Sequence, residues 1–262
     1  MNSPTGRTSL FGRILFALSF LTRLPLPSWV HEMGLPEGLG SLPLFLTGLL
    51  LGGLLSLLFW VLSAQSFLPF PVSPYLRAFL LIAAWTYLTG ALHLDGVADA
   101  TDAAFAPVSP EEKRRIRKDP RKGAFAIVAL NLFLIGKWTG ILLATGPLPI
   151  LLAPILARSV LPLLFAGVAS GDPARPPEGL GALLLSGGSG ERWIGPGLAI
   201  LAAVVTERGA GGIVSLLTVG GLYLLGRFLS HRMDGPSGDL AGLLVEAGEV
   251  LFLLLSSVPM GA

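Results

Sequence analysis

Residues 91–102 read ALHLDGVADATD, and they place three carboxylates at the end of an apolar run that begins near Tyr75. In a helix, Asp95, Asp99 and Asp102 stand at i, i+4 and i+7, within roughly 60° of one another on one face. Like charges at this spacing destabilise a helix unless a cation lies between them, and oxygen ligands suit Mg²⁺. A helix end with solvated acids is the alternative, but ionisable groups at membrane depth are costly, which favours a functional cluster.

The composition predicts the class of protein. A chain of 262 residues with 52% hydrophobic and 13% charged side chains is too apolar for a soluble domain. We therefore predict an all-α, polytopic integral membrane bundle that forms a single membrane-embedded domain, residues 1–262. The absence of cysteine excludes disulfides and thiolate metal ligands. The apolar composition makes the lipid bilayer the expected partner, and a net charge of only +2, without a basic face interleaved with aromatic residues, argues against nucleic acid.

Apolar runs predict about six to seven transmembrane helices. We place them at residues 42–62, 75–94, 124–144, 149–169, 194–205, 213–229 and 243–259. The run at 14–24 is too short to span, so we predict an interfacial or re-entrant helix with Arg7, Arg13 and Arg23 facing lipid head groups, or else a short packed helix.

The orientation follows from the basic residues. Seven of the ten positions from Lys113 to Lys122 are Lys or Arg, which predicts a cytoplasmic loop. With that loop inside, the three aspartates also lie at the cytoplasmic end of their span. Carboxylates facing a group of Lys and Arg are typical of phosphoryl transfer, in which a metal and cations stabilise charge on phosphate oxygens.

Other ionisable residues fall within the predicted spans. Arg158 should either pair with an acid such as Glu246 or contact a substrate phosphate. Asp239, Glu246 and Glu249 share a helix face of roughly 80°, and their alternative role is an internal ion pair between spans. We expect Lys137 to extend outward towards the membrane surface.

The sequence resembles the cobalamin synthase family over nearly its whole length. Residues 91–103 resemble its segment G-x-L-H-L-D-G-L-A-D-T-x-D-A/G, and residues 117–126 resemble M-K-D-S-R-x-G-x-F/Y-G. Residues 237–249 are similar to T-G-D-x-x-G-A-x-x-E-x-x-E, and residues 20–25 to F-x-T-R-L/I-P. The departures leave the acids and Lys118 intact; they are Arg117 for Met, Pro120 for Ser, Ala126 for Gly and Ser237 for Thr.

The resemblance implies an Mg²⁺-dependent enzyme of the bacterial inner membrane whose active site faces the cytoplasm. Such an enzyme joins α-ribazole, or its 5′-phosphate, to adenosylcobinamide-GDP and releases GMP, and we take the attacking group to be the ribazole 5′-hydroxyl. A homo-oligomer, or association with other enzymes of cobalamin synthesis, is left open.

The resemblance also assigns roles to residues. It implies Asp95, Asp99, Asp102 and Lys118 as catalytic, with metal ligation by these three aspartates and Asp119. Asp102 or Asp239 is the candidate general base. Substrate contacts are assigned to His93, Arg121, Arg158, Asp239 and Glu246, although His93 lies opposite Asp95 on a regular helix and also fits a packing or hydrogen-bonding role.

Two other functions compete with this interpretation. A CDP-alcohol phosphotransferase also uses spaced aspartates at a membrane face, but its D-x-x-D-G-x-x-A-R pattern is not matched, since Gly96 directly follows Asp95 and no Arg follows Ala98. A transporter would use Asp95, Asp99 and Arg158 as an ion path. The clustering of charge on one side, and the lack of an internal repeat, argue against transport.

Overall fold

The protein is described by a computed structural model that covers residues 9–64, 71–116, 119, 121–168, 179–186, 188–206, 210–233 and 235–259, without the side chains of 110, 111 and 114. Within these ranges the regular structure is entirely helical, which confirms the predicted fold class. The elements, in order, are α2 (Leu10–Leu21), α3 (Ser28–His31), α4 (Ser41–Ser63), α5 (Pro74–Thr89), α6 (Leu92–Phe105), α7 (Pro110–Ile116), α8 (Ala124–Leu143), α9 (Pro147–Ser159), α10 (Leu161–Val168), α11 (Leu180–Leu185), α12 (Glu191–Thr206), α13 (Ala210–Met233) and α14 (Gly238–Ser256).

Four helical segments of the described chain are long and apolar enough to span a bilayer, and a fifth qualifies if α5 and α6 count as one bent span. The four are α4, α8, α9 with α10, and α13. The prediction of six to seven spans also counted α12 and α14. However, α12 has only 16 residues, and α14 carries three carboxylates within 19 residues.

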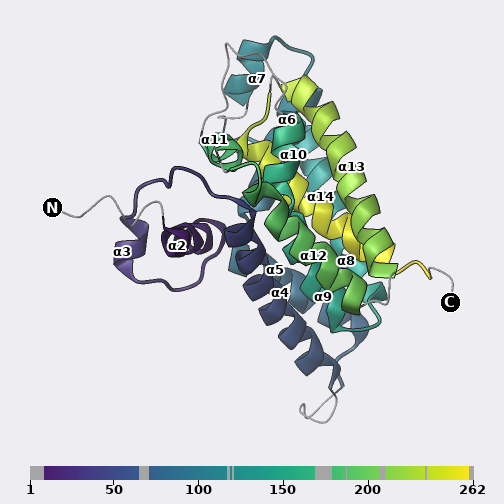
Figure 1. The fold of residues 1–262 in the computed structure, drawn as a ribbon. Helices are drawn as coiled ribbons and strands as arrows, with labels where there is room; N and C mark the ends of the chain where they lie inside the picture. The colour runs from purple at the N-terminus through teal and green to yellow at the C-terminus, as the bar shows by residue number, and fades with distance from the viewer. Residues whose placement is uncertain are drawn as a thin grey trace.

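The long helices form one bundle, and α2 and α3 lie beside it (Figure 1). In this view α4 runs along the bundle, whereas α2 is seen end-on, so the two axes cross. The apolar, twelve-residue α2 therefore has the length and direction predicted for an interfacial helix. Arg13 differs from the prediction, because its guanidinium donates to Glu191 of α12 at 2.7 Å instead of facing head groups.

Glycines bring the backbones of neighbouring helices into direct contact. Gly48 and Gly52 form a G-x-x-x-G pair on α4, and a Cβ at either position would collide with the α9 backbone at Pro154 or Leu151. Small residues at this spacing allow close helix packing inside a membrane, where van der Waals contact replaces the hydrophobic effect as the driving force. The α4–α9 contact is the most extensive between two helices, and α14 packs on α9 and also on α6, α8 and α13.

The helix that leads to the aspartates is broken, which corrects the predicted continuous span 75–94. α5 ends at Thr89, Gly90 and Ala91 both adopt left-handed conformations with φ of 60° and 58°, and α6 starts at Leu92. The two helices meet at 86°. A left-handed Ala is strained, and such strain persists only where the surrounding structure holds it. The bend turns the aspartate-bearing α6 away from the direction of α5.

Candidate functional site

Two of the three predicted aspartates converge on one cation. Asp95 and Asp99, one turn apart on α6, accept hydrogen bonds from the Lys122 ammonium at 2.9 and 2.5 Å. The Asp95 side chain is 65% exposed and that of Asp99 only 12%, so the pair lies between solvent and the bundle interior. Burial alone would lower the pKa of Lys122, but hydrogen bonds to Asp99 and Asp95 raise it above its ordinary value. Lys122 is therefore positively charged near neutral pH.

The acidic face of α6 is held in place by contact with α14. A Cβ on Gly96 would lie 2.9 Å from the Asp239 carbonyl oxygen and 3.0 Å from the Gly242 Cα. The two helices can approach this closely because both residues at the crossing are glycines. The contact places Asp239, in the first turn of α14, next to the first turn of α6.

The third aspartate caps another helix. The two carboxylate oxygens of Asp102 accept hydrogen bonds from the backbone N–H groups of Gly123 and Ala126, at 2.5 and 2.9 Å. These groups lie at the N-terminus of α8, where N–H groups have no partner within the helix and the helix dipole favours a negative charge. Asp102 therefore joins α6 to α8, a role that its spacing from Asp95 and Asp99 did not indicate.

The capping role predicts different effects of two substitutions at Asp102. Asp102→Ala removes both contacts to α8 and should cost about 0.5–2 kcal/mol of stability, whereas Asp102→Asn keeps an acceptor oxygen and should cost less. Thermal unfolding in detergent, measured together with GMP release, tests this. If Asp102→Asn is as stable as the wild type but inactive, the carboxylate is needed for chemistry, as the family resemblance implied.

Asp119 and Arg121 contact each other. Arg121 donates its Nε, Nη2 and backbone N–H to the Asp119 carboxylate at 3.0, 2.8 and 2.9 Å. The Arg121 side chain and backbone hydrogen bonds hold the pKa of Asp119 down at about 2, so this acid is ionised at any physiological pH. Neither residue reaches the Asp95 and Asp99 pair in this arrangement. Lys118 lies outside the described residues, and its assigned role stays a prediction.

A second group of charges is buried in the bundle. The Lys137 ammonium donates to Glu246 at 2.5 Å and to Glu249 at 2.6 Å, and Arg158 donates to Glu249 at 2.5 Å. All four side chains are at most 4% exposed. The prediction that Lys137 extends outward is therefore wrong. Arg158 does pair with an acid, but with Glu249 and not with the suggested Glu246.

The buried charges balance, two positive against two negative. Trp85 adds a hydrogen bond from its Nε1 to Glu249 at 3.3 Å, and its ring lies 4.5 Å from the Lys137 ammonium. Because each ion has an opposite charge in contact, the group can remain ionised in an apolar environment. We name Lys137, Arg158, Glu246 and Glu249 the buried ion cluster. An internal ion pair between spans is the alternative role predicted for Asp239, Glu246 and Glu249, and the contacts of Glu246 and Glu249 in this cluster are of that kind.

His93 is buried against the same part of the bundle. His93 is only 2% exposed, and neither nitrogen of its ring has a hydrogen-bond partner among the described residues. A Cβ added to Gly242 of α14 would lie 3.3 Å from the His93 carbonyl oxygen and 3.4 Å from the His93 Cα. This burial is consistent with the packing role, and the substrate contact assigned to His93 stays a prediction.

The donor set fits a divalent cation at the acid pair. Asp95 and Asp99 direct oxygen atoms at one positive charge, here the Lys122 ammonium, and carboxylate oxygens are ligands that Mg²⁺ prefers. Since Mg²⁺ is commonly held by one or two carboxylates together with substrate phosphates, two acids suffice. No group of three or more His, Cys, Asp or Glu side chains suited to a metal occurs in the described part of the chain.

Sequence reasoning missed two cations. Lys122 was one of seven basic residues in a run, and nothing in the run distinguishes it from its neighbours. Lys122 directly precedes Gly123, the N-cap of α8, and Asp102 of α6 accepts a hydrogen bond from the Gly123 N–H, so this contact brings Lys122 close to α6. For Lys137, the available signal was the shared helix face of Glu246 and Glu249, because two buried acids require cations as partners.

The fold and these contacts define a polytopic membrane protein with a carboxylate and lysine site at one end of its bundle. The sequence profile of the family described as cobalamin-5-phosphate synthase matches residues 13–257. The chain therefore belongs to this family.

Named relatives agree with the family assignment. An adenosylcobinamide-GDP ribazoletransferase of Stutzerimonas stutzeri is 36% identical over 256 residues, which is 95% of this chain and 98% of that protein. Proteins of the same name from Pseudomonas paraeruginosa and Pseudomonas aeruginosa PAO1 are 39% and 38% identical over 92% of this chain and 96% of their own length. No solved structure matches the chain.

Proposed function

We propose that the chain is an adenosylcobinamide-GDP ribazoletransferase, which transfers the adenosylcobinamide phosphate group to a ribose hydroxyl of α-ribazole or its 5′-phosphate and releases GMP. Relatives of nearly the same length carry this name. The observation that carries the proposal is the convergence of Asp95 and Asp99 on Lys122, because a site for a pyrophosphate needs both a metal-binding acid pair and a cation.

The reaction exchanges one phosphorus–oxygen bond for another. A ribose oxygen attacks the phosphorus attached to cobinamide, the bond from that phosphorus to GMP breaks, and the ribose hydroxyl proton passes to a base. The family description names a cobalamin 5-phosphate. In an acceptor phosphorylated at the 5′ position, that oxygen is occupied, so we propose a secondary ribose hydroxyl as the nucleophile in place of the 5′-hydroxyl expected above.

Asp95 and Asp99 would hold Mg²⁺, which neutralises charge on the pyrophosphate oxygens when bound. Lys122 supplies a second positive charge beside this pair and can donate to a phosphate oxygen. Asp102 and Asp239 are the candidate bases, and both oxygens of Asp102 accept backbone hydrogen bonds at the start of α8. Lys118 and Arg121 remain candidates for contacts to the phosphates of the nucleotide.

The test is release of GMP by the purified protein in lipid nanodiscs. Adenosylcobinamide-GDP is supplied with either α-ribazole or its 5′-phosphate, and each reaction is run with Mg²⁺ and with EDTA. We expect GMP only with donor, acceptor and Mg²⁺ together. GMP release that is unaffected by EDTA would contradict the metal role alone, and its absence under every condition would contradict the reaction.

We further propose that the site faces the cytoplasm of a bacterial inner membrane. Since the chain has no cysteine, a single introduced cysteine reports its location without background. Arg115→Cys in α7, at a side chain 81% exposed, should react with an impermeant maleimide only after spheroplasts are permeabilised. Thr145→Cys, in the exposed turn between α8 and α9, is the matched control and should react in intact spheroplasts. The reverse pattern would contradict the orientation.

A further inference from the structure

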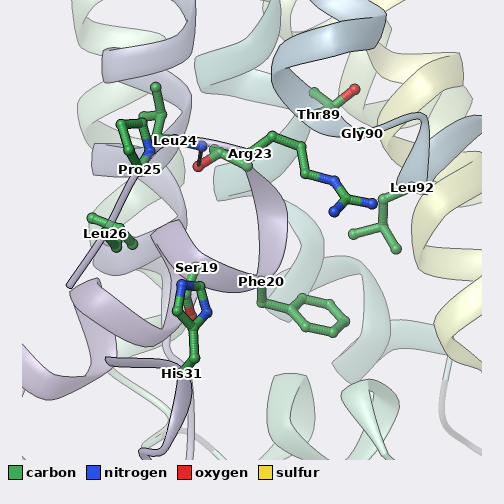
Figure 2. A pocket seen from close by; sticks show the side chains of 11 residues that line it. Ser19, Phe20, Arg23, Leu24, Pro25, Leu26, His31, Thr89, Gly90 and Leu92 are labelled. Carbon is green, nitrogen blue, oxygen red and sulfur yellow. Dashed lines mark hydrogen bonds between the residues drawn. The ribbon is translucent and has the colours of Figure 1, made fainter. Parts of the chain in front are cut away.

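A cavity of about 430 Å³ lies where α2 and the loop after it meet the break between α5 and α6. Figure 2 shows the Arg23 side chain reaching from the end of α2 towards Leu92, next to Gly90, while His31 approaches from another side. The lining residues combine two basic side chains with an apolar wall. Apart from Arg23 and His31, they include Phe20, Leu24, Pro25, Leu26 and Leu92.

Arg23 is held in this position by the backbone. Its N–H donates to the Leu88 carbonyl at 2.7 Å, which ties the end of α2 to the last turn of α5. The side chain then passes over Gly90, where any Cβ would collide with the Arg23 Nε. Glycine is favoured at position 90 because its φ of 60° is one that other residues rarely adopt.

The Arg23 side chain is exposed, and its guanidinium has no ion-pair or hydrogen-bond partner among the described residues. By contrast, the nearby hydroxyls of Thr22 and Thr89 donate to the carbonyls of Leu18 and Trp85. Arg23 also lines a second hollow, with Thr86, Tyr87 and Gly90. An exposed guanidinium whose donors have no partner among the described residues, placed between two hollows, can bind an anion from outside the chain.

The cavity adjoins the candidate active site. Leu92 lines the cavity and starts α6, and Asp95 lies in the first turn of that helix. Arg23 also belongs to the F-L-T-R-L-P stretch at residues 20–25, one of the segments that resembles the family but to which the proposed reaction gives no role. A ligand in the cavity would therefore contact the first residue of the helix that carries the aspartates.

We propose that this cavity binds the acceptor as a nucleoside monophosphate, with its phosphate on Arg23 and its apolar fused-ring base against Phe20, Leu24 and Leu92. This inference rests on the proposed function. A volume of about 430 Å³ suits a nucleotide-sized ligand and is far too small for the corrin-bearing donor. The planar guanidinium matches two phosphate oxygens at once, which a single lysine cannot do. Arg23 thereby makes the phosphorylated nucleoside the preferred acceptor over the unphosphorylated one.

The experiment compares the two acceptors in wild type and variants. Binding of α-ribazole 5′-phosphate and of α-ribazole is measured by calorimetry, without donor, in nanodiscs of zwitterionic lipid. Arg23→Ala should weaken binding of the phosphate about tenfold to a hundredfold, from the loss of a charged hydrogen-bonding partner, and change binding of the nucleoside little. Arg23→Lys should recover part of the affinity. Arg115→Ala, which removes an exposed cation elsewhere at the same end, should have no effect.

Other results would overturn the proposal. An equal loss for both acceptors, or no loss for either, would mean that Arg23 does not bind the phosphate. A phosphate diester of a membrane lipid offers the same chemistry, so binding is repeated with anionic lipid in the nanodisc. If Arg23→Ala changes only the uptake of anionic lipid, the cavity binds lipid and not the acceptor. Because binding is measured without turnover, failure of the proposed reaction would be seen separately, as missing GMP release in the wild type.

Discussion

Asp99→Asn should reduce GMP release by about a hundredfold or more while leaving the protein folded in the membrane, and Asp95→Asn should do the same. Each substitution removes a negative charge but keeps the size of the side chain. The Lys122 ammonium, now held at 2.9 and 2.5 Å, would lose one of its two acidic partners, and a bound metal would lose the negative charge of one of its two carboxylate ligands. Loss of a single well-placed electrostatic contact in an active site commonly costs about two to three orders of magnitude in rate.

The measurement separates chemistry from folding. GMP release is followed across Mg²⁺ concentrations, and thermal unfolding is recorded on the same preparations. Glu112→Gln is the matched control, since it removes one negative charge from the exposed surface of neighbouring α7, where the Glu112 carboxylate lies 3.5 Å from Arg115. Near-normal turnover of Asp95→Asn and Asp99→Asn at saturating Mg²⁺ would show that neither carboxylate is needed for the reaction.

Local patterns in the sequence predict the elements of this fold well. The apolar runs at 42–62, 124–144, 149–169 and 213–229 correspond to α4, α8, α9 with α10, and α13, because a span needs a continuous apolar surface that is visible in composition alone. The helical spacing of Asp95 and Asp99 also predicts that they share a face, and the structure brings them to one cation.

The features that the sequence did not predict depend on contacts between residues far apart in the chain. The break between α5 and α6 places the non-glycine Ala91 in a left-handed conformation, against its local preference, so only the tertiary structure can maintain it. Lys122 finds its aspartates because Asp102 caps α8, a contact between residues far apart in the chain. Lys137 faces inward because two glutamates lie on the helix opposite, and no property of α8 alone indicates this.

The buried ion cluster leads to the largest expected effect on stability. Glu249→Gln leaves Lys137 and Arg158 with Glu246 as the only remaining acid of the cluster, and a net positive charge stays in the bundle. Removing one partner of a buried ion pair typically costs about 3–5 kcal/mol, because the remaining charge is neither solvated nor paired. Unfolding in mixed detergent micelles should show this loss, whereas the exposed Glu112→Gln should change stability little.

A double substitution tests whether charge balance is the cause. Lys137→Met and Glu246→Gln each leave the cluster with an unpaired charge, but together they remove one positive and one negative charge and leave the Arg158–Glu249 pair at 2.5 Å intact. The double variant should therefore lose less stability than the sum of the two single variants, by about 0.5–3 kcal/mol of coupling. Simple additivity would contradict charge balance. Glu249→Gln that stays stable but releases no GMP would instead indicate that the cluster acts on substrate, the role that the family resemblance implied for Arg158 and Glu246.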